Sequence, residues 1–427
     1  MLKLFFDSAI SLSFKIISVG LKFVLIYFIT NNYGAENYGA YMFAMSLFLL
    51  LNTVSRFGFD VYIQKLTAEM LNKNNEKLAR YKFLEIASIS FLTLLLLSFI
   101  IKVYFHFFNK QIGLRVQYID ELIVYAAAYA IYWMMMYYFR GIGRGKVSVF
   151  VMEITQPMLA ILALLSFKHF NNEYFTEIEI LVHSFGLSIT LCVIIFFVLG
   201  KFNNLNLRSQ INLSREKVKF HLQNSKPFLI ISTSAMLLAW VDMYVISFFV
   251  SDSDIGVYSM ASRLSMFILF PVSAISIFFA NILVELFALD DRQGIRTYLN
   301  SITGVLSIVS ILIALFLNLY GTEILSLFGK GFDQGENLLL VLSVGYTLSA
   351  MFGSYETVLL ISDYKERLSR INLQMIFLNL VLNFPLVYYY GINGAAAGTL
   401  IVIVYSRLLQ IYLVNKYVLS KHELLVP

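Results

Sequence analysis

Residues 86–101 read IASISFLTLLLLSFII, an apolar stretch that contains no charged side chain. A strand of a membrane barrel would alternate hydrophobic and polar residues, and this stretch does not. A helix needs about 20 residues to cross the roughly 30 Å hydrocarbon core of a bilayer, and the stretch provides this length together with its apolar neighbours. It therefore predicts a transmembrane helix.

Similar apolar stretches recur from one end of the chain to the other. Of the 427 residues, 59% are hydrophobic and 14% are charged, whereas about 25% of the residues in an ordinary soluble domain are charged. The first stretch lacks a small-residue cleavage site and is followed by others, so we expect a retained helix rather than a signal peptide. The composition predicts an all-α integral membrane protein without a separate soluble domain.

The apolar stretches predict twelve transmembrane helices, arranged as two six-helix bundles. The first six spans are expected near residues 8–31, 38–62, 83–105, 119–139, 147–167 and 178–200. The second six are expected near residues 227–250, 256–286, 299–320, 336–361, 370–390 and 393–415. These spans predict an N-terminal bundle at 1–200, a basic cytoplasmic linker at 201–226 and a C-terminal bundle at 227–427.

The Lys and Arg residues indicate which loops face the cytoplasm, where an excess of them is expected. With the N-terminus inside, the inside loops hold 22 of these residues and the outside loops hold 5. We therefore expect a multi-pass protein with both termini in the cytoplasm. The net charge of +6 follows from this bias and does not indicate a nucleic-acid partner.

The two groups of spans show a trace of internal repetition. Sliding the sequence by 217 residues aligns Gly39, Tyr41 and Ala44 with Gly256, Tyr258 and Ala261. Transporters are commonly built from two repeated halves with the substrate site at their interface. The pattern therefore favours a transporter.

Motifs for bond chemistry are missing from the sequence. The glycine-rich turn at 141–146 lacks the spacing of a nucleotide-binding loop and the Ser or Thr that would follow Lys146. The five histidines are scattered without the spacing of metal ligands. We therefore expect no enzyme, no metal site and no cofactor.

Charged residues inside the spans are the strongest functional indicators, because each costs at least about 2.5–3.5 kcal/mol near the bilayer centre. Ser11, Lys15, Ser18 and Lys22 follow one face of the first helix. Lys22 lies about 21 Å from the inside end, too deep to reach the headgroups, and is predicted to be a buried functional cation. Lys15 lies about 10 Å in, so it either joins Lys22 or extends back to the interface.

Asp242, Arg263 and Arg407 extend this set of membrane charges. Asp242 lies at a depth similar to that of Lys22, and one helical turn from its repeat-related position. The two side chains either face each other across the halves as part of a site, or form an ion pair that only locks the helices. Arg263 and Arg407 either join a cationic cavity or extend to the interface.

Three acidic residues in the spans have simpler interpretations. Arg56 and Asp60, four residues apart, are expected to form a local salt bridge near the inner boundary. Glu153 lies near Pro157, where a bend is expected, and Glu356 lies near the inside end of its span. Both glutamates are expected to be residues at a membrane boundary rather than parts of an ion-binding site.

Amide and aromatic side chains add candidates for a cavity. Asn379 shares a helix face with Asn372 and Asn383, where amides either bind a sugar or bind a neighbouring helix. Tyr41 and Tyr258 occupy matching repeat positions and either line a cavity or pack in the core.

Three stretches carry a resemblance to a known family: YGAENYGAY at 33–41, SDIGVY at 253–258, and an Asn-rich helix with a Gly-Ile-x-Gly-Ala-Ala turn at 379–397. Together with the two six-helix halves and the basic linker, they resemble the Wzx-type polysaccharide repeat-unit flippases. These belong to the multidrug/oligosaccharidyl-lipid/polysaccharide exporter (MOP) superfamily. The resemblance covers essentially the whole chain.

The resemblance implies a V-shaped pair of bundles in a bacterial inner membrane. Such a protein flips an undecaprenyl-diphosphate-linked oligosaccharide from the cytoplasmic to the periplasmic leaflet by alternating access, for O-antigen or capsule synthesis. A polysaccharide polymerase and a chain-length regulator are further partners that it implies. Combined with the span analysis, the substrate-binding candidates are Lys15, Lys22, Arg263, Arg407, Tyr41, Tyr258 and Asn379. The candidates for gating or ion coupling are Asp242, Arg56, Asp60 and Glu153.

Two other functions remain open. A cation-coupled multidrug exporter of the same superfamily would concentrate acidic rather than basic residues in its cavity. A membrane glycan polymerase would carry its chemistry on a large outside loop, and the longest outside loops expected here have only about 15 residues.

Overall fold

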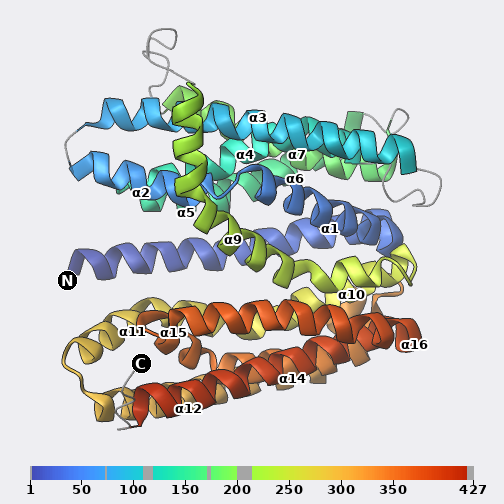
Figure 1. The fold of residues 1–427 in the computed structure, drawn as a ribbon. Coiled ribbons are helices and arrows are strands. Elements are labelled where there is room, and N and C mark those ends of the chain that lie inside the picture. The colour runs from blue at the N-terminus through green and yellow to red at the C-terminus, as the bar shows by residue number, and fades with distance from the viewer. Residues whose placement is uncertain (1, 73–74, 109–118, 171–174, 200–213, 421–427) are drawn as a thin grey trace. The chain divides into compact units, whose positions relative to one another are not determined.

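The computed structural model describes residues 2–72, 75–108, 119–170, 175–199 and 214–420 (Figure 1). Every regular element in these ranges is a helix, which confirms the predicted all-α class. The chain forms two compact units. The first unit comprises Met1–Tyr33 and Ala40–Leu237, and the second unit comprises Gly34–Gly39 and Leu238–Pro427.

The first unit is built mainly from the helices before residue 238. They are α1 (Leu2–Ser55), α2 (Phe59–Asn72), α3 (Glu76–Phe108), α4 (Ile119–Gly141), α5 (Gly145–Phe150), α6 (Gln156–Phe170), α7 (Glu177–Leu199) and the beginning of α9 (Arg215–Ile246). Residues 201–213 of the expected linker lie outside the described residues, and the rest of it from Arg215 onward is helical.

The second unit is built mainly from the helices that follow. They are α10 (Asp252–Met266), α11 (Phe270–Ala288), α12 (Arg292–Leu319), α13 (Gly321–Leu327), α14 (Glu336–Met351), α15 (Gly353–Ile361) and α16 (Lys365–Leu413). A π-helical turn, Val414–Leu419, follows α16.

Within the described ranges, eight helices are long and apolar enough to cross a membrane. The number is nine if Phe332–Met351 and Gly353–Ile361, bent by 42° at their junction, cross as one. Two of the eight, Ser13–Ser55 and Glu366–Leu419, contain 43 and 54 residues. Each is about twice as long as a single crossing requires.

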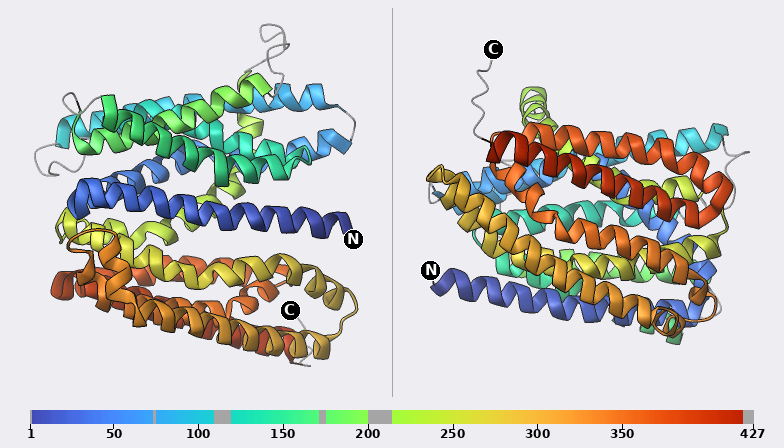
Figure 2. Two further views of the ribbon diagram at one scale, coloured as in Figure 1. Left: turned by 180° about the vertical axis from the view of Figure 1, so that it is seen from behind. Right: turned by 90° about the horizontal axis from the view of Figure 1, so that it is seen from below.

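Glycine kinks divide these two long helices. Gly34 in α1 has φ 76° and Gly391 in α16 has φ 57°, backbone conformations that residues with a Cβ rarely adopt. The ribbon turns back at both places (Figure 1). The α1 segment before its kink is a single long helix in both views of Figure 2. The expected span pairs 8–31 with 38–62, and 370–390 with 393–415, therefore meet at these glycines.

The expected continuous span at 38–62 is wrong. Helix α1 ends at Ser55 and α2 begins at Phe59, because Phe57 (φ 51°) and Gly58 (φ 73°) leave the helical conformation. A Cβ on Gly58 would lie 2.4 Å from the backbone nitrogen of Leu229, so only glycine lets α9 approach this closely. The break is therefore fixed by packing against a distant helix.

Two spans of the second half are also interrupted. A 3₁₀ turn, Phe267–Leu269, separates α10 from α11, whose first turn contains a proline that cannot donate a backbone hydrogen bond. A break at Phe352 separates α14 from α15. The expected span 336–361 is thus two helices bent by 42°, and the expected span 256–286 contains a 3₁₀ turn.

The repeat-related glycines Gly39 and Gly256 lie against each other within the second unit. A Cβ on Gly39 would lie 1.8 Å from the carbonyl oxygen of Asp252, and a Cβ on Gly256 would lie 2.2 Å from that of Ala35. Because the offset of 217 also relates Ala35 to Asp252, the contact is reciprocal. Small residues permit such close backbone approach between membrane helices. The weak sequence repeat therefore marks a two-fold-like helix crossing.

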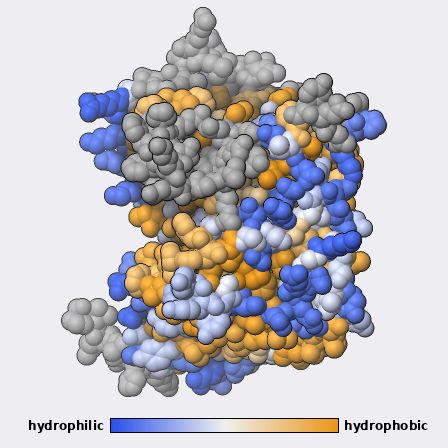
Figure 3. All heavy atoms as spheres, turned by 90° about the vertical axis from the view of Figure 1, so that its right-hand side faces the viewer, coloured by the Kyte–Doolittle hydropathy of each residue, from blue (hydrophilic) through white to orange (hydrophobic). Residues whose placement is uncertain are grey.

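Apolar side chains fill the interior and also cover much of the surface. In the first unit, Phe83, Met134, Met135 and Met136 are fully buried in the core. On the face drawn in Figure 3, hydrophobic residues lie at the surface beside hydrophilic ones. Large exposed apolar side chains, such as Phe377 at 70%, are expected where lipid rather than water surrounds a helix.

Candidate functional site

The deepest predicted cation, Lys22, is paired with Glu153 in the first unit. The Lys22 Nζ lies 2.7 Å from Glu153 Oε2, and Ser18 Oγ donates to the same oxygen at 2.5 Å. Lys15, two helical turns before Lys22 on α1, is close enough for its charge to act on this carboxylate. Two lysines therefore face one carboxylate, which leaves the cluster with a net positive charge. We call Lys15, Ser18, Lys22 and Glu153 the lysine cluster.

A π-helical turn positions Glu153. The turn, Val151–Thr155, joins α5 to α6, and the Gln156 N–H bonds to the Val151 carbonyl five residues earlier. Pro157 has no N–H to offer the carbonyl of Glu153, so the regular α-helical bond is missing at this point. The expected bend near Pro157 is therefore a π-helical widening, a feature that is frequent at functional sites.

The lysine cluster differs from its prediction in one respect. Lys22 was predicted to be a buried cation, whereas its side chain is half-exposed and pairs with Glu153, which was expected to be a boundary residue. The Lys22 side chain is 51% exposed and that of Glu153 is 22% exposed, so the pair is not sealed in a dry contact. An anion that approaches Lys22 would compete with Glu153 for it.

Asp242 is the centre of a second cluster, in the second unit. Its Oδ2 accepts hydrogen bonds from Thr399 Oγ1 at 2.7 Å and Tyr258 OH at 3.0 Å, and its Oδ1 accepts from Asn383 Nδ2 at 2.7 Å. The Asn383 amide also donates to Asn379 Oδ1 at 2.5 Å. We call these five residues the aspartate cluster. Helices α9, α10 and α16 contribute to it.

The partners of Asp242 in the described part of the chain are neutral. Asp242 and Lys22 lie in different units, and each finds its partners inside its own unit. One further acceptor, Asn383 Oδ1, is buried without a hydrogen-bond partner among the described residues. An excess of oxygen acceptors around a carboxylate fits a hard cation or a proton better than it fits an anion.

The other predicted residues have structural partners or core positions. Arg56 Nη1 bonds Asp60 Oδ2 at 2.9 Å, with both side chains buried, and its guanidinium lies 5.2 Å from the centre of the Trp133 ring. The expected local pair is therefore present, across the break between α1 and α2. Tyr41 packs against the hydrophobic core of the first unit, whereas its repeat partner Tyr258 is buried in the second unit and belongs to the aspartate cluster.

Arg407 on α16 is held by three side chains of the second unit. It donates to Gln410 Oε1 at 2.6 Å, Ser349 Oγ at 2.8 Å and Glu356 Oε2 at 2.9 Å. Glu356 was expected only as a boundary residue. Its carboxylate thus neutralises Arg407, which was predicted to bind the substrate. Arg263 is half-buried on α10.

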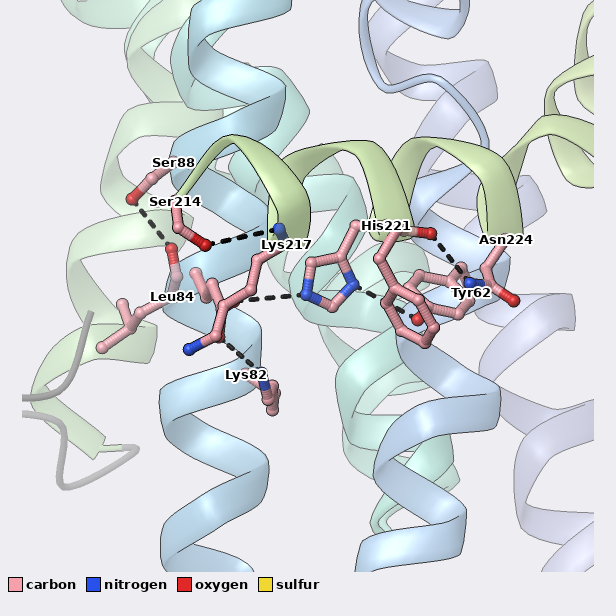
Figure 4. Close-up of polar contacts among 10 residues, drawn as sticks. Tyr62, Lys82, Leu84, Ser88, Ser214, Lys217, His221 and Asn224 are labelled. Carbon is pink, nitrogen blue, oxygen red and sulfur yellow. Dashed lines mark hydrogen bonds and ion pairs between the residues drawn. The ribbon is translucent and has the colours of Figure 1, made fainter. Parts of the chain in front are cut away.

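Sequence reasoning missed a buried cluster around His221 (Figure 4). His221 Nε2 lies 3.3 Å from Glu85 Oε1, and its Nδ1 lies 3.2 Å from Tyr62 OH. Lys82 Nζ donates to the other Glu85 oxygen at 2.7 Å. These contacts attach α9 to α2 and α3. The spacing of Lys82 and Glu85 along one helix face was the signal available, whereas the partner on α9 is 136 residues from Glu85.

Comparison with known sequences gives a family match over most of the chain. The family described as Polysaccharide biosynthesis protein matches residues 6–283. The probable flippase AglR of Haloferax volcanii is 30% identical over 190 residues, which cover 43% of this chain and 39% of the relative. The chain spans less than half the length of the curated relatives that it matches.

Comparison with solved structures gives the fold. A MATE family multidrug resistance transporter of the MOP superfamily, inward-facing, matches with TM-score 0.72 at 15% identity over 96% of this chain and 98% of that one. The lipid II flippase MurJ, inward closed, matches with TM-score 0.70 at 16% identity over 96% of this chain and 86% of that one. The described chain therefore has the fold of MOP-superfamily transporters. These relatives and neighbours are flippases and transporters, not enzymes.

Proposed function

Because the chain belongs to the polysaccharide biosynthesis protein family, we propose that it is a flippase that moves a lipid-linked glycan across the membrane. The family match over residues 6–283 carries this proposal, and the flippase relatives support it. We take the substrate to be an oligosaccharide on undecaprenyl diphosphate, moved from the cytoplasmic to the periplasmic leaflet for O-antigen or capsule synthesis.

The proposal includes the membrane topology. We propose twelve spans in two halves, 1–200 and 227–427, with both termini in the cytoplasm of a bacterium whose inner membrane holds the protein. The charge bias of the loops supports this orientation. The two kinked helices α1 and α16, each long enough for two crossings, support the count.

The lysine cluster is the part of the site that we assign to the diphosphate. Its net positive charge lowers the cost of bringing an anionic headgroup into the low-dielectric membrane interior. The half-exposed Lys22 is available to exchange Glu153 for a phosphate oxygen. Glu153 then keeps the lysine oriented when no substrate is bound, because an unpaired charge in a span is costly.

The aspartate cluster is the part that we assign to ion coupling. Its carboxylate, hydroxyl and amide oxygens fit a proton or a monovalent cation, and its residues come from three helices. Occupation by a cation would draw α9, α10 and α16 together, and release would loosen them. Such a change in helix packing is the kind of step that alternating access requires.

A reconstituted system tests the flippase proposal. Liposomes would contain the purified chain and a fluorescent undecaprenyl-diphosphate-linked oligosaccharide, and an added glycosidase would report the glycan that reaches the outer leaflet. We expect the chain to increase this fraction with time. Lys22→Ala should slow it by at least about tenfold, the effect of losing one charged hydrogen bond, while Lys330→Ala, an exposed loop lysine, should not. A fraction equal to that of empty liposomes would refute flipping.

The same liposomes separate the rival functions. The buried carboxylate of the aspartate cluster specifically favours a cation-coupled drug exporter as the second candidate. Accumulation of a cationic dye without exposure of the glycan would support that exporter. Lengthening of the glycan would indicate a polymerase.

A further inference from the structure

An open, shallow cavity of about 400 Å³ lies beside the beginning of α9, entirely within the first unit. Its apolar part is formed by Phe57, Val218 and Leu222, which also pack against the hydrophobic core of that unit. Its polar rim is formed by Gln223 and the cations Arg215, Lys219 and Lys226. No acidic residue is among the described residues that line it. The cavity thus joins an apolar floor to a cluster of positive charge.

The α9 residues of the cavity form one face of a helix. Positions 215, 218, 219, 222, 223 and 226 recur at spacings of three and four residues. The opposite face of the same segment carries His221, which is buried against Tyr62 and Glu85 (Figure 4). Because that buried cluster fixes the rotation of α9, the three basic residues stay on the helix face that borders the cavity.

The wall opposite α9 has an unusual backbone. Phe57 is one of two residues other than glycine with a positive φ, 51°, in the described part of the chain. Such a conformation costs of the order of 1–3 kcal/mol and is found mainly at functional sites. Here it sets the Phe57 ring in the cavity wall, at the break between α1 and α2.

We propose that this cavity binds an anionic phospholipid from the leaflet on the side of the basic linker. The phosphate would pair with Arg215, Lys219 and Lys226, and the first part of an acyl chain would lie on Phe57, Val218 and Leu222. An amphiphile matches the cavity because its charged and apolar parts are adjacent, as those of the cavity are. A free phosphate would leave the apolar floor uncovered, and a neutral lipid would leave the cations unpaired.

The bound lipid would have a structural effect on the transporter. It bridges the break after α1 to the beginning of α9, the helix that continues from the first unit into the second. This role is separate from transport of the lipid-linked glycan and holds whether or not the chain is a flippase.

Native mass spectrometry of the full chain in detergent tests the proposal, with phosphatidylglycerol and phosphatidylcholine as probes. We expect phosphatidylglycerol to bind at least about tenfold more tightly than phosphatidylcholine, since each basic residue near an anionic lipid strengthens binding about fivefold. The variant R215Q/K219Q/K226Q should weaken phosphatidylglycerol binding by about a hundredfold. Lys217→Gln is the matched control, because Lys217 is an exposed cation of the same helix that does not line the cavity.

Folding and rival ligands are controlled in the same series. The variant K219R/K226R keeps the positive charge and should bind phosphatidylglycerol as tightly as the unchanged chain. The thermal stability of each variant without lipid shows whether that variant folds. The proposal would be overturned if the two lipids bound equally tightly. It would also be overturned if Lys217→Gln weakened phosphatidylglycerol binding as much as R215Q/K219Q/K226Q does. Displacement of phosphatidylglycerol by glycerol 3-phosphate alone would overturn the acyl-chain contact. Binding of undecaprenyl diphosphate in place of phosphatidylglycerol would reassign the cavity to the substrate.

Discussion

The lysine cluster of the first unit and the aspartate cluster of the second unit stabilise a carboxylate in two different ways. Both place a carboxylate inside a membrane helix, where an isolated charge is costly. Glu153 is balanced by the ammonium of Lys22, 2.7 Å away. Asp242 is held by hydroxyl and amide groups, and the partners that the described residues provide carry no charge.

The difference indicates which species each cluster exchanges. The lysine cluster already contains its cations, so what it can gain is an anion. The aspartate cluster contains a carboxylate and neutral oxygens, so what it can gain is a cation or a proton. A flippase for an anionic headgroup that is coupled to a cation gradient needs one site of each kind.

The largest effect is expected from Asp242→Asn, which removes the charge but keeps the shape. We expect the transport rate to fall by at least about tenfold, because a hydrogen bond to a charged group is worth about 1.5–3 kcal/mol. The residual transport should no longer respond to a cation gradient. The measurement is glycan exposure in liposomes with and without proton and sodium gradients. A gradient response that survives in Asp242→Asn would move ion coupling away from the aspartate cluster.

A double-mutant cycle at the lysine cluster should give an intermediate effect. Lys22→Gln removes the cation that is hydrogen-bonded to Glu153 and leaves only Lys15 nearby, and the half-exposed pair limits the loss of stability to about 1 kcal/mol. Adding Glu153→Gln should restore the melting temperature in detergent but not the transport, because the cation that pairs with phosphate is still missing. If the double variant regained transport, Lys22 would serve only to neutralise Glu153.

The smallest effect on transport is expected from removing one neutral donor in each cluster, because the charged groups of both clusters remain. Thr399→Val should cost about 1–3 kcal/mol of stability, because the Asp242 carboxylate then lacks one of its few partners. Ser18→Ala should cost less, about 0.5–1.5 kcal/mol, because Glu153 keeps Lys22 and is partly exposed. Thermal unfolding of both variants in the same detergent compares them directly. A larger loss in Ser18→Ala would contradict the proposed difference between the clusters.

Local patterns in the sequence were enough to predict several features of the structure. The length and polarity of the apolar runs predicted a helical membrane protein. The spacing of Arg56 and Asp60 predicted their salt bridge, since residues four apart lie on one helix face. The offset that aligned Gly39 with Gly256 predicted only an internal repeat, and the structure showed that the two glycines form a close helix crossing, which two backbones reach only where no Cβ intervenes.

Only the tertiary structure decided which charges meet. Lys22 and Glu153 are 131 residues apart, and Asp242 and Thr399 are 157 apart. The cost of burying a charge implies that each membrane charge has a partner, but it does not say which residue is that partner. Periodicity along a helix gives the face on which a residue lies. The packing of that face against a distant helix sets the partner, and this is why Glu356 and His221 gained their roles only once the chain was folded.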